Sequence, residues 1–215
     1  MTPRFKSRIK NHSIAGAVSV LLLLCFHSFI PGDDQKYLWS MATGYTSIIL
    51  LGVTLTIGPL NVIKRKNNPV STDLRRDIGI WCGVIGITHM IVGIQVHMGN
   101  IWLYFVKTVE GNDKYVLRSD LFGAANYTGL LAAIFLLLLL FLSNDLSLRI
   151  LRTSRWKNLQ RWSYAAFILI LAHSVMYEII EKRSLGIVSV FAVIMIIPLI
   201  FQLIGFRRFS TTTKL

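Results

Sequence analysis

Charged residues are scarce in this sequence. Only 15% of its 215 residues are Asp, Glu, Lys or Arg, against 53% that are hydrophobic, and only 10 carry a negative charge. A soluble domain of this size would not combine so little charge with several apolar runs of about 20 residues. The composition therefore excludes an ordinary soluble domain and favours a protein that is embedded in a membrane.

Cysteine is equally rare. The two cysteines, Cys25 and Cys82, both fall inside apolar runs, and neither belongs to a C-x-x-C pair or to the C-x-x-C-H motif that attaches c-type haem. Buried thiols of this kind are usually packing residues. The cysteine pattern therefore excludes a covalently attached haem, and we assign these residues no role.

The sequence also lacks the features of a nucleotide-dependent enzyme. The G-x-G-x-x-G fingerprint does not occur, and no segment outside the apolar runs is long enough to form a flavin or nicotinamide domain. The longest such segment, residues 100–121, is too short to build a core of its own. No catalytic substrate site is visible.

Apolar runs of membrane-spanning length are abundant instead, and we count six. The first resembles a secretory signal because basic residues precede it, but no small-x-small cleavage site follows it. We therefore predict an all-α integral membrane protein with a six-helix domain at residues 13–206, an N-terminal segment at 1–12 and a tail at 207–215. The predicted spans cover residues 13–30, 39–63, 78–99, 122–142, 162–180 and 185–206.

The basic residues predict how these spans are oriented. With six spans, 17 of the 23 lysines and arginines fall in the two terminal segments and the two loops on the same side as the termini. The positive-inside rule therefore places both termini in the cytoplasm. The same bias accounts for the net charge of +13, so we expect contacts with anionic membrane lipid and no nucleic-acid partner.

Two histidines lie at matched depth in the third and fifth spans. His89 follows Asp77, and His173 follows Arg161, in each case 12 residues past the last charge before the apolar run. At about 1.5 Å per helical residue, each is roughly 18 Å into a hydrocarbon core about 30 Å thick. Both spans run in the same direction, so equal offsets mean equal depths. Ionisable residues at such depth indicate function, and this pair predicts one b-type haem with both imidazoles as iron ligands.

A macrocycle also needs room, and glycines flank His89. Those at positions 79, 83, 86 and 93 follow helical spacing along one broad face. Glycines spaced in this way can equally form a close helix-packing surface. Beside a midplane histidine, we favour a flat ligand against this face, with Gly86 and Gly93 in contact with the haem.

The other histidines give weaker signals. His97 lies 8 residues beyond His89, about 12 Å higher and roughly 80° around the helix, so it cannot serve the same ring. We expect it near the outer interface, and a second haem held by His97 and His27 is a minor alternative. The main rival interpretation is a haem-free scaffold or transporter that uses His89 and His173 structurally or as a proton relay. The absence of Asp and Glu from residues 78–99 and 162–177 argues against a relay.

Several short motifs surround the two histidines, and the most specific is a Trp-Lys-Leu cluster that begins at Trp156, 17 residues before His173. With these motifs the chain resembles the ferric reductase-like transmembrane domain family of six-helix b-type cytochromes over residues 44–177. Within that family it looks most like the membrane haem subunits of bacterial periplasmic methionine sulfoxide reductase systems. The motifs are Gly52 with Thr56 and Gly58-Pro59-Leu60, Arg75-Arg76-Asp77-Ile78-Gly79, Ala125-Asn126-Tyr127-Thr128-Gly129, Ser143-Asn144-Asp145 and Arg155-Trp156-Lys157-Asn158-Leu159-Gln160-Arg161.

The resemblance implies a location in the bacterial inner membrane and electron transfer across it through a haem on His89 and His173. Many relatives carry a histidine at the position of Gln160 and use it towards a second, inner haem. Glutamine is a poor iron ligand, so we predict a single haem b. A quinol, or a flavin or flavoprotein, near the cytoplasmic side would then supply the electrons.

On the outer side we expect an electron acceptor, which is a separate protein, ferric iron or dioxygen. The loop at residues 100–121 is rich in aromatics and either caps the haem edge and docks the acceptor or forms an interfacial belt. We predict that Arg118 in this loop pairs with a haem propionate. The chain would thus be the electron-transfer subunit of an oxidoreductase, with a cytochrome that exchanges electrons with quinone alone as a further alternative.

Overall fold

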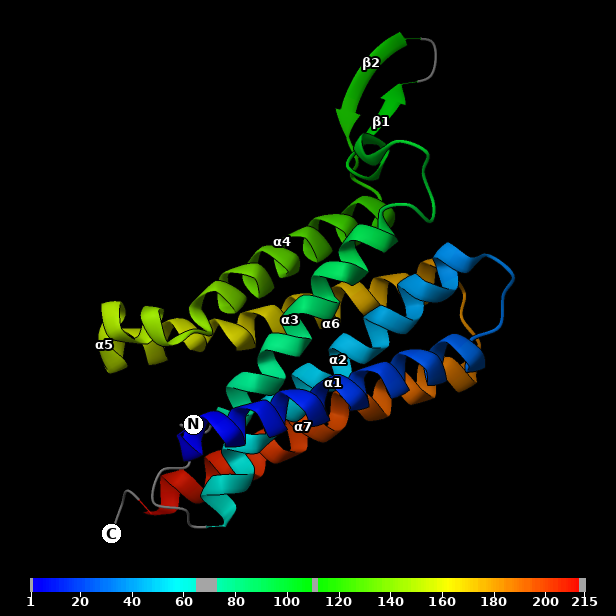
Figure 1. Ribbon diagram of the computed structural model, residues 1–215. Helices are drawn as coiled ribbons and strands as arrows, with labels where there is room; N and C mark the ends of the chain where they lie inside the picture. The colour runs from blue at the N-terminus through cyan, green and yellow to red at the C-terminus, as the bar shows by residue number, and fades with distance from the viewer. Residues whose placement is uncertain (1, 65–72, 110–111, 213–215) are drawn as a thin grey trace.

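The computed structural model describes residues 2–64, 73–109 and 112–212, and these form mainly α-helix (Figure 1). Between α3 and α4 lie a 3-10 helix, Ile101–Tyr104, and an antiparallel hairpin of β1 (Val106–Val109) and β2 (Asn112–Leu117). The α-helices are α1 (Pro3–Phe29), α2 (Gln35–Ile63), α3 (Asp73–Gly93), α4 (Leu121–Leu142), α5 (Asp145–Gln160), α6 (Trp162–Ile180) and α7 (Leu185–Thr212).

Helix α2 is the centre of one half of the bundle, where it packs against α1, α3 and α7. Helix α4 organises the other half and packs against α6, and the two halves join mainly through α3 and α4. The β1–β2 hairpin projects from one end, which we call the hairpin end (Figure 1). Both chain termini lie at the opposite, terminal end.

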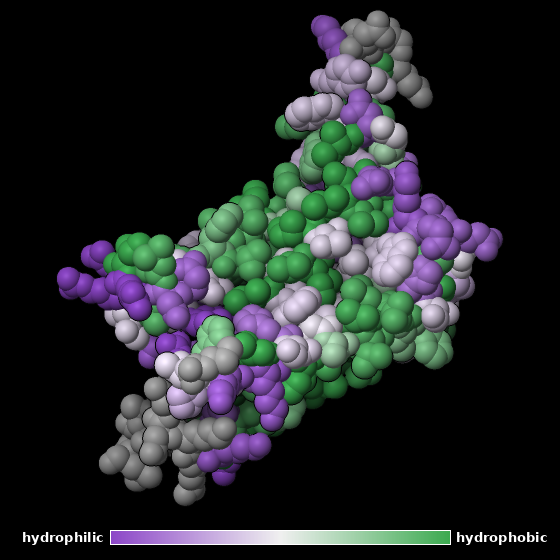
Figure 2. Space-filling model, viewed as in Figure 1, coloured by the Kyte–Doolittle hydropathy of each residue, from purple (hydrophilic) through white to green (hydrophobic). Residues whose placement is uncertain are grey.

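The surface and composition of the helices are those of a multi-pass membrane protein. Hydrophobic residues cover the middle of the bundle, and hydrophilic residues gather towards its ends (Figure 2). Five segments are long and apolar enough to cross a membrane: α1, α2, α4, the α5–α6 segment Asp145–Ile180, and Leu185–Arg208 within α7. Helix α3 is not among these five, and its first turns carry two aspartates and two arginines.

Each of the six predicted apolar runs lies within or overlaps one helix, but the third ends earlier than predicted. Helix α3 stops at Gly93 rather than at residue 99. The reason is Tyr104, which is only 1% exposed and whose hydroxyl donates to the Gly93 carbonyl at 3.1 Å and accepts the His97 amide at 2.9 Å. In a longer helix the Gly93 carbonyl and the His97 amide would bond each other. Here the buried Tyr104 hydroxyl bonds both of them instead.

Three further elements depart from the predicted pattern. The loop at 100–121 forms the hairpin, so the fold is not purely α-helical. Residues 145–160, predicted as a loop, form α5, which is capped by the Asn144 side chain and kinked at Arg152, where φ is +58°. Residues 3–12, predicted as a separate segment, continue α1.

At the terminal end, ion pairs join α1 to α3. Asp77 is fully buried and accepts hydrogen bonds from Arg8 at 2.8 Å and from Asn11 at 3.0 Å, with the His12 ring 3.3 Å away. Nearby, Asp145 of α5 pairs with Arg76 of α3 at 2.7 Å. A buried carboxylate is tolerated only when it is paired and hydrogen-bonded, so these contacts fix the position of α3 beside α1.

We expect Asp77→Ala to destabilise the bundle by roughly 3 kcal/mol, because it leaves the Arg8 guanidinium partly buried without its carboxylate. The measurement is the thermal unfolding midpoint of the detergent-purified protein. Asp33→Ala, at an exposed position of the hairpin end, is the control and should leave the midpoint unchanged. Equal midpoints for the two variants would contradict this role of Asp77.

Candidate functional site

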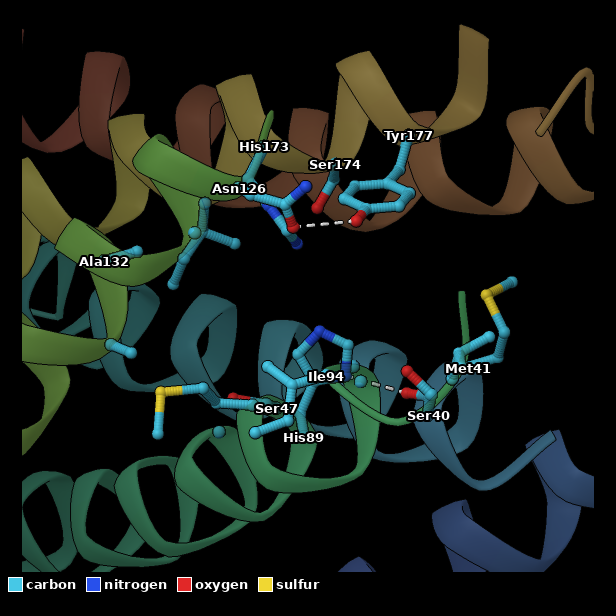
Figure 3. Close-up of a pocket in the computed structure, with 18 of the residues that line it drawn as sticks. Ser40, Met41, Ser47, His89, Ile94, Asn126, Ala132, His173, Ser174 and Tyr177 are labelled. Carbon is cyan, nitrogen blue, oxygen red and sulfur yellow. Dashed lines mark hydrogen bonds between the residues drawn. The ribbon is translucent and has the colours of Figure 1, made fainter. Parts of the chain in front are cut away.

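His89 of α3 and His173 of α6 face each other across the gap between the two halves of the bundle (Figure 3). Their ring centres are 6.2 Å apart and the ring planes meet at 77°. The two imidazoles therefore lie close together, as expected for residues at matched depth in parallel spans, and their depth in a membrane stays a prediction. The two side chains extend into the gap from opposite walls.

Each imidazole is held by a hydrogen bond from Nδ1 to a backbone carbonyl of another helix. His89 Nδ1 donates to the Ser40 oxygen of α2, and His173 Nδ1 donates to the Ala125 oxygen of α4, both at 2.8 Å. A carbonyl oxygen only accepts, so each Nδ1 carries the proton and each Nε2 keeps its lone pair. Metal-binding histidines are commonly oriented by this kind of bond on the other ring nitrogen.

A glycine of the same supporting helix makes room for each ring. A Cβ atom on Gly129 of α4 would lie 2.6 Å from His173 Nδ1, and one on Gly44 of α2 would lie 3.1 Å from His89 Cε1. Any side chain at position 129 would therefore displace the ring from its carbonyl partner. Neither glycine was predicted from the sequence to contact an imidazole.

Gly86 and Gly93, predicted to face a haem, do line the cavity beside His89. They also allow close helix packing. A Cβ on Gly86 would lie 2.7 Å from Leu136 Cδ1 and 2.9 Å from Ser47 Oγ, and a Cβ on Gly93 would lie 3.4 Å from Ser40 Oγ. Close helix packing is thus observed at both glycines, and their contact with a haem stays a prediction.

A cavity of about 290 Å³ surrounds the imidazole pair and extends towards the hairpin end. Its walls come mainly from α2, α3, α4 and α6, and they are apolar around the middle of the bundle, where Ile48, Leu136 and Ile170 contribute. Towards the hairpin end the lining becomes polar and includes Glu178 and Arg183.

The donor set restricts what the two imidazoles can hold. Two metal–nitrogen bonds of about 2.0 Å, plus the distance from each nitrogen to its ring centre, add to roughly 6 Å, in agreement with the observed 6.2 Å. Within the described residues, no group of three or more His, Cys, Asp or Glu side chains could bind a metal ion. A bare zinc ion would lack its usual third and fourth ligands, whereas the iron of a haem needs only two axial ligands from the protein.

Arg118 does not line the cavity. Its guanidinium donates to the Asp120 carboxylate, at 2.8 Å for the shortest bond, and to the Leu103 carbonyl at 3.1 Å, and it stacks over Phe122 at 4.8 Å. These contacts tie the end of the hairpin to the start of α4. The structure therefore gives Arg118 partners of its own, and no contact in it favours the predicted bond to a propionate.

His97 and His27 do not form a second pair. His97 Nε2 lies 3.1 Å from a carboxylate oxygen of Glu181, whereas His27 Nε2 bonds the Gln35 side chain at 3.1 Å. Gln160, at the end of α5, has a buried Nε2 with no partner in the described part of the chain. A single haem stays a prediction.

The sequence analysis missed one charged group of the cavity, Glu178 with Arg183. They lie at the end of the fifth span and just after it, where charges are common in any membrane protein. The available signal was that Glu178 falls within the predicted span of residues 162–180, one turn and a residue beyond His173.

Comparison with known proteins gives no match: no family model, no curated protein and no solved structure is significantly similar to this chain. The resemblance of the motifs to ferric reductase-like proteins therefore stays a sequence-based expectation.

The Arg118–Asp120 pair makes a prediction about pH. The Arg118 guanidinium, aided by the Gly123 amide, holds the pKa of Asp120 below its ordinary value of 3.8. The stabilisation that Asp120 gives the start of α4 is therefore fully present above pH 3.8 and lost as the pH falls through the lower folded pKa. We expect Arg118→Gln to move this loss upwards towards pH 3.8.

The measurement is hydrogen exchange of peptides covering residues 118–125 between pH 2.5 and 6, corrected for the intrinsic pH dependence of exchange (about tenfold per unit). Lys114→Gln, at an exposed position of β2, is the control. Identical pH profiles for wild type and Arg118→Gln would show that the pair does not cap α4.

Proposed function

We propose that this protein is a membrane b-type cytochrome that carries single electrons across the bilayer through one haem bound by His89 and His173. The observation that carries the proposal is the imidazole pair itself. Its ring centres are 6.2 Å apart, both Nδ1 atoms are bonded to backbone carbonyls, and both rings line one cavity. When bound, haem would supply a reversible one-electron iron couple.

The chain's own residues prepare this site in three ways. The Ser40 and Ala125 carbonyls fix the tautomer and the direction of each ring, so that Nε2 is the nitrogen available to iron. Gly44 and Gly129 let the rings approach their supporting helices closely. The walls in the middle of the cavity are apolar, which lowers the local dielectric and strengthens the polar contacts made there.

The direction of transfer that we propose follows from the two ends of the bundle. The terminal end carries most of the basic residues, which by the positive-inside rule is the cytoplasmic end. The cavity extends from the imidazoles towards the hairpin end. We propose that a quinol or a flavoprotein reduces the haem from the cytoplasmic side or the membrane, and that a protein, ferric iron or dioxygen accepts the electron outside.

This assignment agrees with the resemblance to ferric reductase-like membrane cytochromes and with a place in the bacterial inner membrane. The motif Ala125-Asn126-Tyr127-Thr128-Gly129, which supports that resemblance, supplies two contacts of His173 and an acceptor for Tyr177. We therefore propose the role of an electron-transfer subunit of an oxidoreductase, with a separate protein providing the substrate site.

The first test is the reduced-minus-oxidised optical spectrum of the detergent-purified protein, with the haem quantified as its pyridine complex. We expect a low-spin b-type spectrum and about one haem per chain. His89→Ala and His173→Ala should each abolish the low-spin spectrum, because a single remaining imidazole leaves one axial position of the iron without its ligand.

His27→Ala is the matched control, since His27 bonds Gln35 and does not line the cavity. Normal low-spin haem in either His89→Ala or His173→Ala would overturn the ligand assignment. A wild-type protein without haem, purified from haem-replete cells, would overturn the proposal in favour of a haem-free scaffold or transporter. Reduction by quinol with no reoxidation by any outer acceptor would instead indicate a cytochrome that exchanges electrons only with quinone.

The packing of Gly129 gives a second prediction. In Gly129→Ala the new methyl group would lie 2.6 Å from His173 Nδ1, so the ring must leave the Ala125 carbonyl. We expect haem occupancy to fall roughly tenfold, the size of effect seen when the supporting contact of a metal ligand is removed, while the helical circular dichroism signal persists.

Gly79→Ala is the control for Gly129→Ala. It is a glycine of α3 whose added methyl group would meet Thr54 at an ordinary 3.7 Å, so its haem occupancy should match that of wild type. Full occupancy in Gly129→Ala would show that the ring position does not depend on this glycine.

A further inference from the structure

The two histidines are held by segments of the same construction, which we call the support segments. Residues 40–44 of α2 read Ser-Met-Ala-Thr-Gly, and residues 125–129 of α4 read Ala-Asn-Tyr-Thr-Gly. In each segment the carbonyl of the first residue accepts a hydrogen bond from a histidine, which lies 49 positions after Ser40 and 48 positions after Ala125. In each segment the final glycine makes room for that same imidazole. The two halves of the bundle thus hold their imidazoles by one repeated arrangement.

The threonine of each support segment bonds the carbonyl that holds the histidine. Thr43 donates to the Ser40 oxygen at 2.9 Å, and Thr128 donates to the Ala125 oxygen at 2.9 Å. Each hydroxyl also reaches the carbonyl of the preceding residue, at 2.7 Å in α2 and 3.0 Å in α4. The single proton of each hydroxyl is therefore shared between two carbonyls, one of which is the partner of a histidine.

Other helical threonines bond their helix differently. Thr54, Thr56 and Thr88 each donate to the carbonyl four residues earlier, which is the usual bond of a threonine inside a helix. Of the threonines in the part of the chain that the structure describes, Thr43 and Thr128 are the two that also bond the carbonyl three residues earlier. In both cases that carbonyl is the one bonded by an imidazole, so the general habit of helical threonines does not account for the match.

Three donors meet at each of these carbonyl oxygens. They are the helix's own amide four residues later, the threonine hydroxyl and the Nδ1 group of the histidine. A carbonyl oxygen has two lone pairs, so three donors must share them and each bond is weaker than it would be alone. The threonine hydroxyl therefore weakens the hydrogen bond that the imidazole makes.

We propose that Thr43 and Thr128 are positioning residues that moderate the hydrogen bond from each imidazole to its carbonyl and thereby raise the reduction potential of the haem. A strong hydrogen bond from Nδ1 increases the electron density of the imidazole and favours the oxidised iron. By taking a share of the carbonyl, each threonine limits that effect. The inference rests on the proposed function, because the potential is that of a haem bound by His89 and His173.

The experiment is a redox titration of the haem in the detergent-purified variants Thr43→Val and Thr128→Val. Valine keeps the β-branched shape of threonine and removes its hydroxyl. At a fixed ambient potential, we expect the ratio of reduced to oxidised haem to fall about three- to tenfold in each variant, the effect of changing about one hydrogen bond. This fall corresponds to a midpoint potential lower by about 28–59 mV for a one-electron couple. The low-spin optical spectrum should persist.

Two controls test whether the hydroxyl at these two positions is responsible. Thr43→Ser and Thr128→Ser keep a hydroxyl and should retain the potential of wild type. Thr54→Val removes a hydroxyl from the same helix as Thr43, where it donates at 2.8 Å to a carbonyl that no histidine bonds, and should leave the potential unchanged. An unchanged or higher potential in the two support-segment valine variants would overturn the proposal, and so would an equal fall in Thr54→Val.

A measurement without haem separates this inference from the proposed function. In protein produced without haem and with isotope-labelled histidine, the Nδ1 proton of His89 should resonate further downfield in Thr43→Val than in wild type, because a stronger hydrogen bond deshields the proton. Thr54→Val should not move this resonance. If the resonance moves but wild type never binds haem, the action of Thr43 on the imidazole stands and the cytochrome proposal fails. If haem binds and neither the resonance nor the potential changes, the cytochrome proposal stands and this inference is wrong.

Discussion

The hydrogen bonds from the two imidazoles to backbone carbonyls constrain the rest of this structure. His89 of α3 needs the Ser40 carbonyl of α2, and His173 of α6 needs the Ala125 carbonyl of α4. Each half of the bundle contains one of the two histidines. Its ring is fixed by a backbone carbonyl of the helix that packs beside the helix carrying the histidine. The two halves can therefore be separated in the middle while both rings keep their hydrogen bonds. The cavity between the halves is a consequence of this arrangement.

Polar groups inside the bundle are placed according to the cost of burying charge. The middle of the cavity contains two imidazoles held by neutral carbonyls, and no charged group of the described residues lines it there. Full charges occur at the two ends, where Asp77 pairs with Arg8 and Glu178 pairs with Arg183. Each of these buried charges lies beside an opposite charge, because a buried charge is tolerated only when it is paired.

The helices could be predicted largely because hydrophobic length is a local property. Each of the six apolar runs corresponds to a helix, and the shared direction of the third and fifth runs was enough to predict that His89 and His173 lie close together. The departures occur where a distant residue decides the local structure. Helix α3 ends at Gly93 because the Tyr104 hydroxyl takes over its backbone partners, and α5 forms in a basic segment whose Asp145 pairs with Arg76.

The sequence by itself indicated several helices of membrane-spanning length and two histidines at one level of the bundle, because composition and spacing along a helix are enough for both. It also indicated room beside His89, through the glycines of α3. Only the tertiary structure decided which carbonyls orient the rings, that Gly44 and Gly129 make space for them, and that Arg183 rather than Arg118 borders the cavity. Those features depend on contacts between residues such as His89 and Ser40, which are 49 positions apart. Every residue has a backbone carbonyl, so the type of residue at position 40 does not show that its carbonyl accepts a hydrogen bond from a distant side chain.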